Sequence, residues 1–275
     1  MRIRPAAVAG MFYPDETVRL AREVRALLAA ADVRALRPKA LIVPHAGYPY
    51  SGPVAASAYA LLAPLARRIH CVVLLGPAHR VALRGLALPD AEAFDTPLGR
   101  VGIDLAGVRL SVRLPQVSVS AQAHALEHSL EVQLPFLQTL LPDFKLVPLV
   151  VGEASAETVL EVLDTLWGGA ETLILISSDL SHYLPYAAAK RMDRLTADAI
   201  LHLQAPVSHE QACGGTAVNG LMLAARRHGL TPHLLDLRNS GDTAGARDQV
   251  VGYGAFAFTE SSMEGVNHGG IHQHA

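Results

Sequence analysis

The stretch Ala40–Gly52, ALIVPHAGYPYSG, carries the first evidence for the fold, because an apolar strand runs directly into a loop of histidine, glycine, proline and tyrosine. The run Ala40–Pro44 is nearly continuous in apolar residues, which is typical of a strand buried on both faces of a sheet. His45 stands where this strand ends. Ligands of open α/β sheets bind outside the carboxyl ends of strands, so the stretch predicts a buried sheet with an imidazole at its binding edge.

The rest of the chain alternates between short apolar runs and longer runs with helical spacing. Five more runs predict strands: Cys71–Leu75, Lys145–Val151, Thr172–Ile176, His233–Leu237 and Val251–Phe258. Five segments predict helices: Asp15–Ala31, Val54–Ala66, Ala156–Leu166, Ala189–Leu203 and Ala217–His228, the last ended by Gly229. This order predicts an α/β fold, a single domain over residues 1–260 with a central mixed β-sheet flanked by helices. We expect residues 261–275, SSMEGVNHGGIHQHA, to form a disordered Gly/His-rich tail.

Composition supports a large core and excludes several classes of partner. The 275 residues are 51% hydrophobic and 17% charged, which argues against disorder. The 23 basic and 25 acidic residues leave a net charge of -2, so we expect neither nucleic-acid nor membrane-surface binding. The longest apolar stretch, 60–76, is interrupted by proline, arginine and histidine, so no bilayer span is expected. Two distant cysteines and no signal-peptide pattern predict a cytoplasmic protein.

The chain contains 13 histidines, and two of them follow predicted strands. Leu74–His79, LLGPAH, repeats the arrangement around His45: an apolar strand, a Gly-Pro turn and then His79. Either histidine alone is more simply a turn residue satisfied by the backbone. The pair, delivered to one edge of the sheet, indicates a metal or acid–base site, because neutral imidazole is the commonest protein metal ligand.

A third strand ends in Ser177–Tyr183, SSDLSHY, which contains an acid and a histidine three residues apart. One helical turn at the strand end would place Asp179 and His182 on a common face. The carboxylate would then orient the imidazole and raise its basicity, as it does for general bases and metal ligands. The alternative is that Asp179 or Ser181 caps a following helix.

The two cysteines have different sequence contexts. Cys213 precedes two glycines and an apolar helix, and a helix N-terminus favours the thiolate, so we predict that Cys213 is a metal ligand or redox group. Cys71 lies inside a predicted strand and is expected to be buried and inert.

The segment Glu127–Leu137, EHSLEVQLPFL, places His128 between two glutamates. It predicts an amphipathic helix kinked by Pro135, with Glu127 and Glu131 on one face. Near a metal, His128 and Glu127 would become part of the pocket. Away from one, the segment is an ordinary helix.

Taken together, eight short motifs between about residues 3 and 259 resemble the MEMO family. They are GMFYP (Gly10–Pro14), PHAGYPYSG (Pro44–Gly52), LGPAH (Leu75–His79), EHSLEVQLPFL (Glu127–Leu137), SSDLSHY (Ser177–Tyr183), CGG (Cys213–Gly215), NSGDT (Asn239–Thr243) and VGYGA (Val251–Ala255). Each motif is weak alone, and their common order is specific. The wider resemblance is to the LigB-type class III extradiol dioxygenases, which share the α/β fold.

The resemblance implies a mononuclear metal site on His45, His79 and Cys213, with Asp179 and His182 in the same pocket. In the dioxygenase relatives two histidines and a glutamate bind Fe(II), and the histidine of the SSDLSH-like motif is the acid or base. Here Cys213 takes the place of the glutamate, which argues against ring cleavage itself, because two histidines and a carboxylate are the usual Fe(II) set. The mixed, softer set suits Fe(II), Cu(I) or Zn(II), and the resemblance makes iron the first expectation, with copper or zinc as alternatives.

The function expected from these residues is metal-dependent redox or oxygen chemistry on a small substrate. His182, oriented by Asp179, would move a proton, and Tyr48, Tyr50 and Tyr13 would wall the pocket. The competing class is a non-catalytic binding or adaptor protein that uses the pocket for a peptide or small ligand. Animal members of the family are linked to signalling, and microbial members resemble a component that accompanies a radical-SAM enzyme. A third possibility is a zinc hydrolase with water activated by His182 or Glu127.

Overall fold

The computed structural model describes residues 2–204 and 206–260, so the predicted tail, 261–275, lies outside the described residues. The strands are β1 (Ile3–Arg4), β2 (Pro38–Val43), β3 (Cys71–Pro77), β4 (Leu86–Leu88), β5 (Ala93–Thr96), β6 (Gly99–Gly102), β7 (Val117–Val119), β8 (Lys145–Val151), β9 (Thr172–Ser177), β10 (His182–Leu184), β11 (Leu230–Asn239) and β12 (Val250–Glu260). The helices are α1 (Thr17–Ala29), α2 (Tyr48–Tyr59), α3 (Leu105–Ser111), α4 (Ala121–Ala125), α5 (Leu134–Leu140), α6 (Ala156–Thr165), α7 (Tyr186–Leu201) and α8 (Gly215–His228), with short 3-10 turns η1 (Ala60–Leu65), η2 (Glu131–Gln133) and η3 (Ser240–Asp242).

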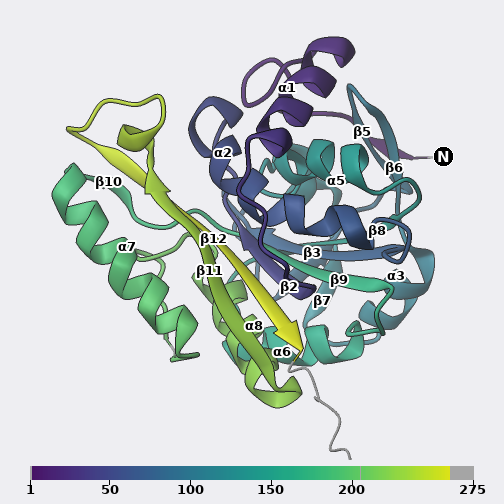
Figure 1. Cartoon of the computed structure of the whole chain (residues 1–275). Coiled ribbons are helices and arrows are strands. Elements are labelled where there is room, and N and C mark those ends of the chain that lie inside the picture. The colour runs from purple at the N-terminus through teal and green to yellow at the C-terminus, as the bar shows by residue number, and fades with distance from the viewer. Residues whose placement is uncertain (1, 205, 261–275) are drawn as a thin grey trace, which may run out of the picture.

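A mixed sheet forms the centre of the molecule (Figure 1). Within the described residues its order is β10-β12-β2-β9-β3-β8-β4-β7, with β11 paired to β12. The four inner strands β2, β9, β3 and β8 are parallel, whereas β12 and β4 run antiparallel to their inner neighbours. The predicted fold, a single α/β domain with a mixed sheet flanked by helices, is confirmed. A small second sheet, β1-β5-β6, was not predicted, because its strands have only two to four residues.

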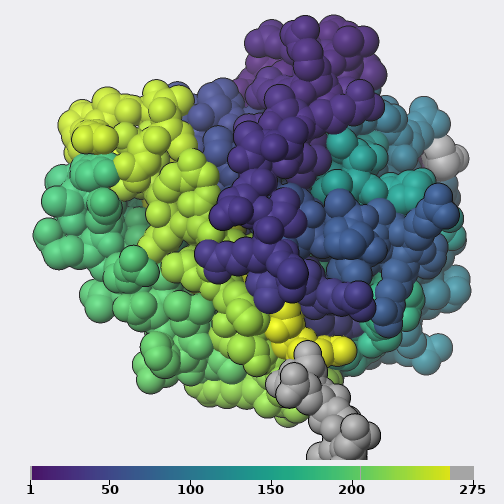
Figure 2. Space-filling view, in the orientation of Figure 1, coloured from purple at the N-terminus to yellow at the C-terminus, as the bar shows by residue number. Residues whose placement is uncertain are grey.

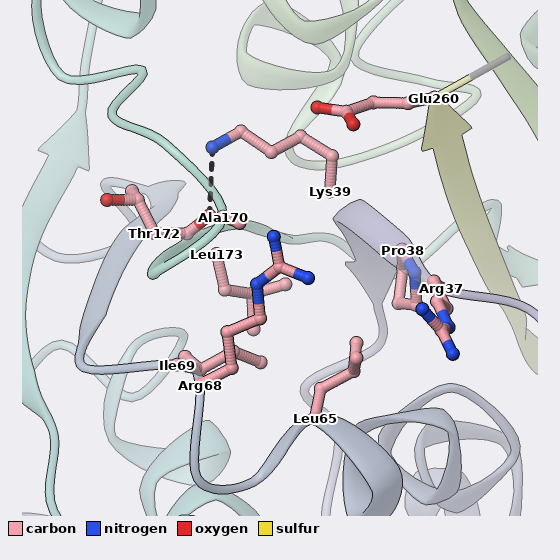
Figure 3. Close-up of a pocket in the computed structure, with 10 residues that line it drawn as sticks. All are labelled: Arg37, Pro38, Lys39, Leu65, Arg68, Ile69, Ala170, Thr172, Leu173 and Glu260. Atoms are coloured by element: carbon pink, nitrogen blue, oxygen red, sulfur yellow. Dashed lines mark hydrogen bonds between the residues drawn. The ribbon is translucent and has the colours of Figure 1, made fainter. Parts of the chain in front are cut away.

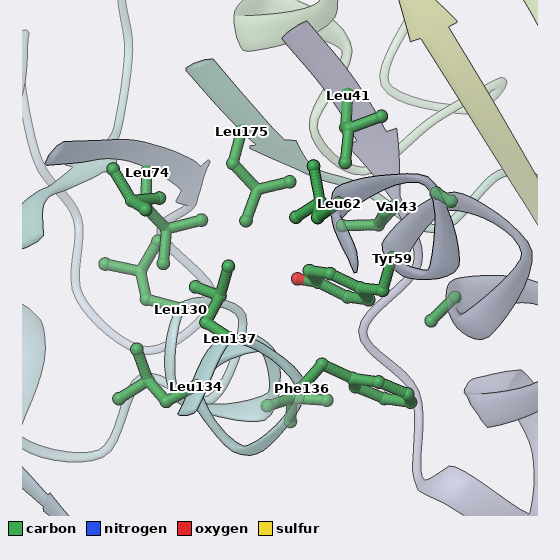
Figure 4. Close-up of a cluster of buried hydrophobic side chains, with 14 of the residues drawn as sticks. Leu41, Val43, Tyr59, Leu62, Leu74, Leu130, Leu134, Phe136, Leu137 and Leu175 are labelled. Carbon is green, nitrogen blue, oxygen red and sulfur yellow. The ribbon is translucent and has the colours of Figure 1, made fainter. Parts of the chain in front are cut away.

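The inner strands are apolar at nearly every position between their ends because alternate residues enter two different cores. Leu41 and Val43 of β2 pack into the core under α1, α2 and α5, whereas Ile42 packs into the core under α6 and α8. Figure 4 shows the first core, where the rings of Tyr59 and Phe136 stack with centroids 4.8 Å apart. Burying an aliphatic side chain of this size contributes about 1.5–3 kcal/mol, so the continuous apolar pattern stabilises the sheet from both sides.

The N-terminal segment crosses the outside of the molecule instead of entering the central sheet. In Figure 2 its purple residues lie between the yellow-green C-terminal strands and the teal helices from the middle of the chain. None of the helices in the described part of the chain has the length and apolar character that a bilayer crossing requires.

The parallel strands place their following residues at one edge of the sheet. Val43 of β2 pairs with Ser177 of β9, and β9 lies between β2 and β3. The residues after the three strands therefore meet, which brings together the loops of His45, Asp179 and His79. This confirms the arrangement that the strand-end histidines predicted.

Three local predictions were wrong. α2 begins at Tyr48, so the predicted YPYSG loop is the first turn of a helix, where proline is tolerated. α5 begins at Leu134, so Pro135 starts a helix and does not kink one. Glu127 therefore lies in a loop and shares no helix face with Glu131.

The third error concerns the segment after β9. The predicted helical turn does not form, because residues 178–181 are a loop and His182 begins strand β10. The predicted end of the last helix is correct: Gly229 has a φ of 67°, the left-handed conformation that glycine adopts without strain.

Candidate metal centre

Three histidines from distant parts of the chain form one cluster at the carboxyl edge of the sheet. One ring nitrogen each of His45, His79 and His128 lie within 4.8 Å of one another. His45 follows β2, His79 follows β3, and His128 lies in the loop before η2. The ring centroids of His45 and His79 are 5.2 Å apart, and those of His79 and His128 are 4.6 Å apart. Such a set of converging imidazoles is a donor set for a transition metal.

Hydrogen bonds determine which nitrogen of His45 is free. Nδ1 of His45 lies 2.8 Å from Oγ of Ser177, whose single proton is donated to the carbonyl oxygen of Ser129 at 2.6 Å. Gln133 donates its amide to the same oxygen at 2.8 Å. Ser177 must therefore accept the proton of Nδ1, because a hydroxyl has only one proton to give. Nε2 of His45 is left with its lone pair.

Glu127 does the same for His79. Its carboxylate lies 2.9 Å from Nδ1 of His79 and also accepts the backbone N–H of His79 at 2.7 Å. Burial would raise the pKa of Glu127, but the hydrogen bonds and charge of His79 outweigh it and lower the pKa to about 2. The ionised carboxylate can only accept, so Nδ1 of His79 carries a proton, and Nε2 is the ring nitrogen that Glu127 does not contact. Metal-ligating histidines have this outer hydrogen bond as a rule.

Two imidazoles of the cluster, those of His45 and His128, have pKa values below the usual value of histidine. Burial, followed by the nearby His128 and His79 rings, lowers the pKa of His45 well below its usual value. Burial also lowers the pKa of His128 to about 4, against the opposing charge of Glu127. Neutral imidazole is the form that binds metal, so these residues are available as ligands at neutral pH.

The sequence predicted His128 as a pocket residue only if a metal site lay nearby, and the structure places His128 inside the histidine cluster. Its Nδ1 is buried and has no hydrogen-bond partner within the described residues, and the nearest charged atom is Oε1 of Glu127 at 3.5 Å. The ring of Phe12 packs against it with centroids 4.8 Å apart. A buried polar atom without a partner costs about 1–3 kcal/mol, which a bound ligand would offset. The residues present therefore fit a metal ion.

Cys213, the third predicted ligand, lies beside the cluster. Its Sγ is 3.4 Å from Nε2 of His45 and 3.9 Å from Oγ of Ser178. The prediction that the start of α8 favours the thiolate was wrong for the metal-free protein. Burial, with the charge of Asp179, raises the pKa of the thiol to about 12. The thiol is protonated unless a metal ion displaces its proton.

Asp179 supports the loop of His45 and does not orient His182. Its buried carboxyl group accepts the backbone N–H of His45 at 2.7 Å, and burial raises its pKa to about 6. Within the part of the chain that the structure describes, no hydrogen bond joins Asp179 to the imidazole of His182. The predicted pairing required a helical turn, which residues 178–181 do not form.

Two cavities open beside the centre, with volumes of about 630 and 560 Å³, and they share His79, Cys213 and His209. His182 lines the smaller cavity together with Met192. Sequence reasoning missed His209, which lies four residues before Cys213, with its Nδ1 3.3 Å from the carbonyl oxygen of Cys213. The cavities give a small molecule access to the cluster and to the imidazole of His182.

The tyrosines predicted as pocket walls lie elsewhere. Tyr48 is fully buried in the core, and its hydroxyl donates to the carbonyl oxygen of Val132 at 2.8 Å. Tyr50 is 41% exposed, and Tyr13 donates its hydroxyl to Glu131. None of the three lines either cavity beside the cluster.

A third pocket lies at the opposite edge of the sheet, where β2 and β9 begin (Figure 3). Its buried amine, Lys39, donates to the carbonyl oxygens of Trp167, Gly169 and Thr172 at 2.6, 2.7 and 2.9 Å. The lysine is therefore saturated by backbone acceptors and serves to hold the 167–172 turn. This pocket lacks the convergent donor groups that the histidine cluster has.

A solved structure shares the fold. A crystal structure of an uncharacterized protein, JW3007, from Escherichia coli K12 superposes with a TM-score of 0.51 at 15% identity, covering 79% of this chain and 99% of that one.

Curated relatives match at higher identity. A MEMO1 family protein of Aquifex aeolicus is 36% identical over 268 residues, which cover 92% of this chain and 98% of the relative. MEMO1 family proteins of Methanosarcina barkeri and Archaeoglobus fulgidus are 34% and 36% identical over 273 residues, covering 92% and 93% of this chain and 98% and 99% of the relatives. A family model described as Memo-like protein matches residues 4–257. The chain therefore belongs to the Memo-like family, as its motifs indicated.

Proposed function

We propose that His45, His79 and His128 hold one transition-metal ion, with Cys213 as a further ligand, and that the protein performs redox or oxygen chemistry on a small substrate. The observation that supports this most strongly is the pair of assigned tautomers. Ser177 and Glu127 each accept the Nδ1–H hydrogen bond of a histidine, which leaves Nε2 of His45 and of His79 as the ring nitrogen available to an ion, and one ring nitrogen of each lies in the same cluster. A turn residue satisfied by the backbone needs no such arrangement.

The donor set limits which ions fit. Imidazole suits iron, copper and zinc, and a thiolate makes the set softer without separating Fe(II), Cu(I) and Zn(II). The likeness to the Fe(II) dioxygenases makes iron the first choice, with copper and zinc as alternatives. When bound, such an ion supplies electron transfer or polarises a substrate oxygen. Cys213 would lose its proton on joining the site, so metal binding is expected to release protons.

His182 is the proton-transfer group of this proposal. It lines the cavity next to Cys213 and His79 and stands outside the three-histidine cluster, so its imidazole is free to give or take a proton from a bound molecule. Asp179 acts through the loop of His45, whose backbone N–H it accepts.

Metal analysis tests the site. Protein purified under anaerobic conditions should contain about one equivalent of metal, and His45→Ala and His79→Ala should lose it. His202→Ala, at an exposed helix end, is the matched control and should keep it. Full stoichiometry in both cluster variants would reject the metal site.

Cys213→Ser and His128→Ala separate the two outer members of the donor set. Loss of metal in both variants is the expected result, and full retention in either variant would remove that residue from the donor set. His182→Gln should keep the metal but reduce metal-dependent oxygen uptake about 100-fold or more with any substrate that turns over. Equal uptake would remove the proton-transfer role.

A non-catalytic binding role for a peptide or small ligand, including service to a radical-SAM system, is the second candidate. It is favoured by Tyr183, which follows His182, is 69% exposed and has a φ of 57°, because strained and exposed aromatic residues gather at binding sites. If partner binding is unchanged after metal removal and no oxygen uptake depends on metal, the binding role stands in place of catalysis.

A further inference from the structure

We infer that Arg4 and Glu131, far from each other in sequence, position the metal centre by fixing the loop that carries Glu127 and His128. This inference rests on the proposed metal function. The two side chains are 4% and 0% exposed and form an ion pair between β1 and η2. Neither residue belongs to the histidine cluster, so both are positioning residues.

Arg4 holds the ligand loop at three points. Its Nε donates to the carbonyl oxygen of His124 at 3.0 Å, its Nη2 donates to the carbonyl oxygen of Glu127 at 2.5 Å, and its Nη1 pairs with the carboxylate of Glu131. The planar guanidinium presents these donors in a fixed geometry, which a flexible ammonium lacks. One side chain thus sets the shape of the segment 124–131.

Glu131 ties that loop to the N-terminal segment. Besides Arg4, its two oxygens accept the backbone N–H groups of Ala7 and Val8 at 2.8 and 3.0 Å and the hydroxyl of Tyr13 at 2.5 Å. The carboxylate therefore connects residues 4–13 to the loop before α5, and its contacts to Arg4, Val8 and Tyr13 are buried.

The fixed loop carries two groups of the proposed centre. Glu127 accepts the Nδ1–H hydrogen bond of His79, and His128 supplies an imidazole. The same N-terminal segment also touches the centre directly: the ring of Phe12 packs on His128, and the carbonyl oxygen of Phe12 accepts the backbone N–H of Tyr48 at 2.8 Å, three residues after His45. A shift of the Arg4–Glu131 ion pair would therefore move the imidazole of His128 and, through Glu127, that of His79.

The energetics of a buried ion pair indicate that Arg4 and Glu131 fix the position of the 124–131 segment more than they stabilise the fold. Removing two charges from water costs several kcal/mol, and an apolar pair of similar volume is often as stable. An interaction network whose donors and acceptors are all used specifies one loop conformation, which an apolar pair does not.

Metal titration of the full chain tests the inference, with Co(II) as the probe because its absorption reports ligand number and geometry. Arg4→Met should weaken Co(II) binding about 10- to 100-fold, the usual effect of losing an outer partner, and should change the absorption spectrum. Arg2 lies two residues before Arg4 and forms an exposed ion pair with Asp90. Arg2→Met is therefore the matched control and should bind Co(II) as the wild type does.

Tyr13→Phe keeps the test decisive if Arg4→Met does not fold, because it removes one hydrogen bond to Glu131 and leaves the ion pair. It should weaken Co(II) binding several-fold with the same direction of spectral change. If the variant that folds has a lower melting temperature but the Co(II) affinity and absorption spectrum of the wild type, the ion pair only stabilises the fold. That result would overturn the inference. If the wild type itself binds no Co(II), the proposed metal function fails, which is a distinct result.

Discussion

The carboxylate of Glu127 accepts both the ring Nδ1–H and the backbone N–H of His79, at 2.9 and 2.7 Å. This double contact fixes the orientation of the imidazole as well as its tautomer. It also explains why Glu127 stays ionised despite burial, since its pKa is lowered to about 2. In the proposed centre this contact would fix the orientation of His79 before an ion binds, which would reduce the reorganisation that binding requires.

We expect Glu127→Gln to weaken metal binding about 10-fold or more, because a neutral amide holds the Nδ1 proton less strongly. Competition with a chelator of known affinity measures the change. Glu153→Gln, an exposed glutamate that lines the neighbouring cavity, is the control. Equal affinities in the two variants would contradict the role of Glu127.

Ser177→Ala should allow His45 to adopt either neutral tautomer. The variant removes the acceptor of the Nδ1 proton and one partner of Gln133, so a buried donor is left unpaired at a cost of about 1–3 kcal/mol. Nitrogen NMR of the imidazole should show a mixture of tautomers, and the melting temperature should fall. Ser118→Ala, an exposed strand position, should change neither. A single unchanged tautomer would remove Ser177 from the argument.

Acid should destabilise the fold through His124. Burial lowers its pKa from 6.5 to about 4, although its Nε2 donates to the carbonyl oxygen of Ala87 at 2.8 Å. Between these values the unfolded chain binds a proton that the folded chain does not, so stability falls as the pH drops from about 6.5 to about 4. The loss from this one group is at most about 3 kcal/mol.

Urea unfolding at several pH values measures that loss. His124→Gln can keep the hydrogen bond to Ala87 without titrating, so its free energy of unfolding should depend less on pH in this window. His202→Gln, at an exposed position, should follow the wild type. Parallel curves for wild type and His124→Gln would refute the assignment.

Both cysteines should resist alkylation in the native protein. Burial raises the pKa of Cys71 and of Cys213 to about 12, with Asp104 and Asp179 adding to the effect. At pH 8 the reactive thiolate is scarce, so iodoacetamide should label either residue slowly in the folded, metal-free protein and rapidly in urea. Mass spectrometry of digested samples gives both rates. Fast native labelling of Cys213 would show that the start of α8 does favour the thiolate.

Local sequence was sufficient for the inner strands of the sheet and for two of the three histidines. These strands are apolar at nearly every position because both faces are buried, and this signal needs no knowledge of the neighbours. His45 and His79 follow two such strands directly, and parallel strands end at one edge, so their meeting followed from the chain itself. The two glycines and the apolar helix after Cys213 indicated a functional cysteine, and its Sγ does lie beside His45.

The tertiary structure alone decided the rest, because the deciding contacts join residues that local spacing cannot relate. His128 enters the cluster since EHSLEVQLPFL is a loop and a 3-10 turn followed by a helix that begins at Leu134, and Arg4, 127 residues before Glu131, holds that loop. Burial and Asp179 set the protonation of Cys213 against the preference of the helix terminus. Periodicity and spacing report which face of an element is buried, whereas protonation and ligand geometry depend on which distant groups share that burial.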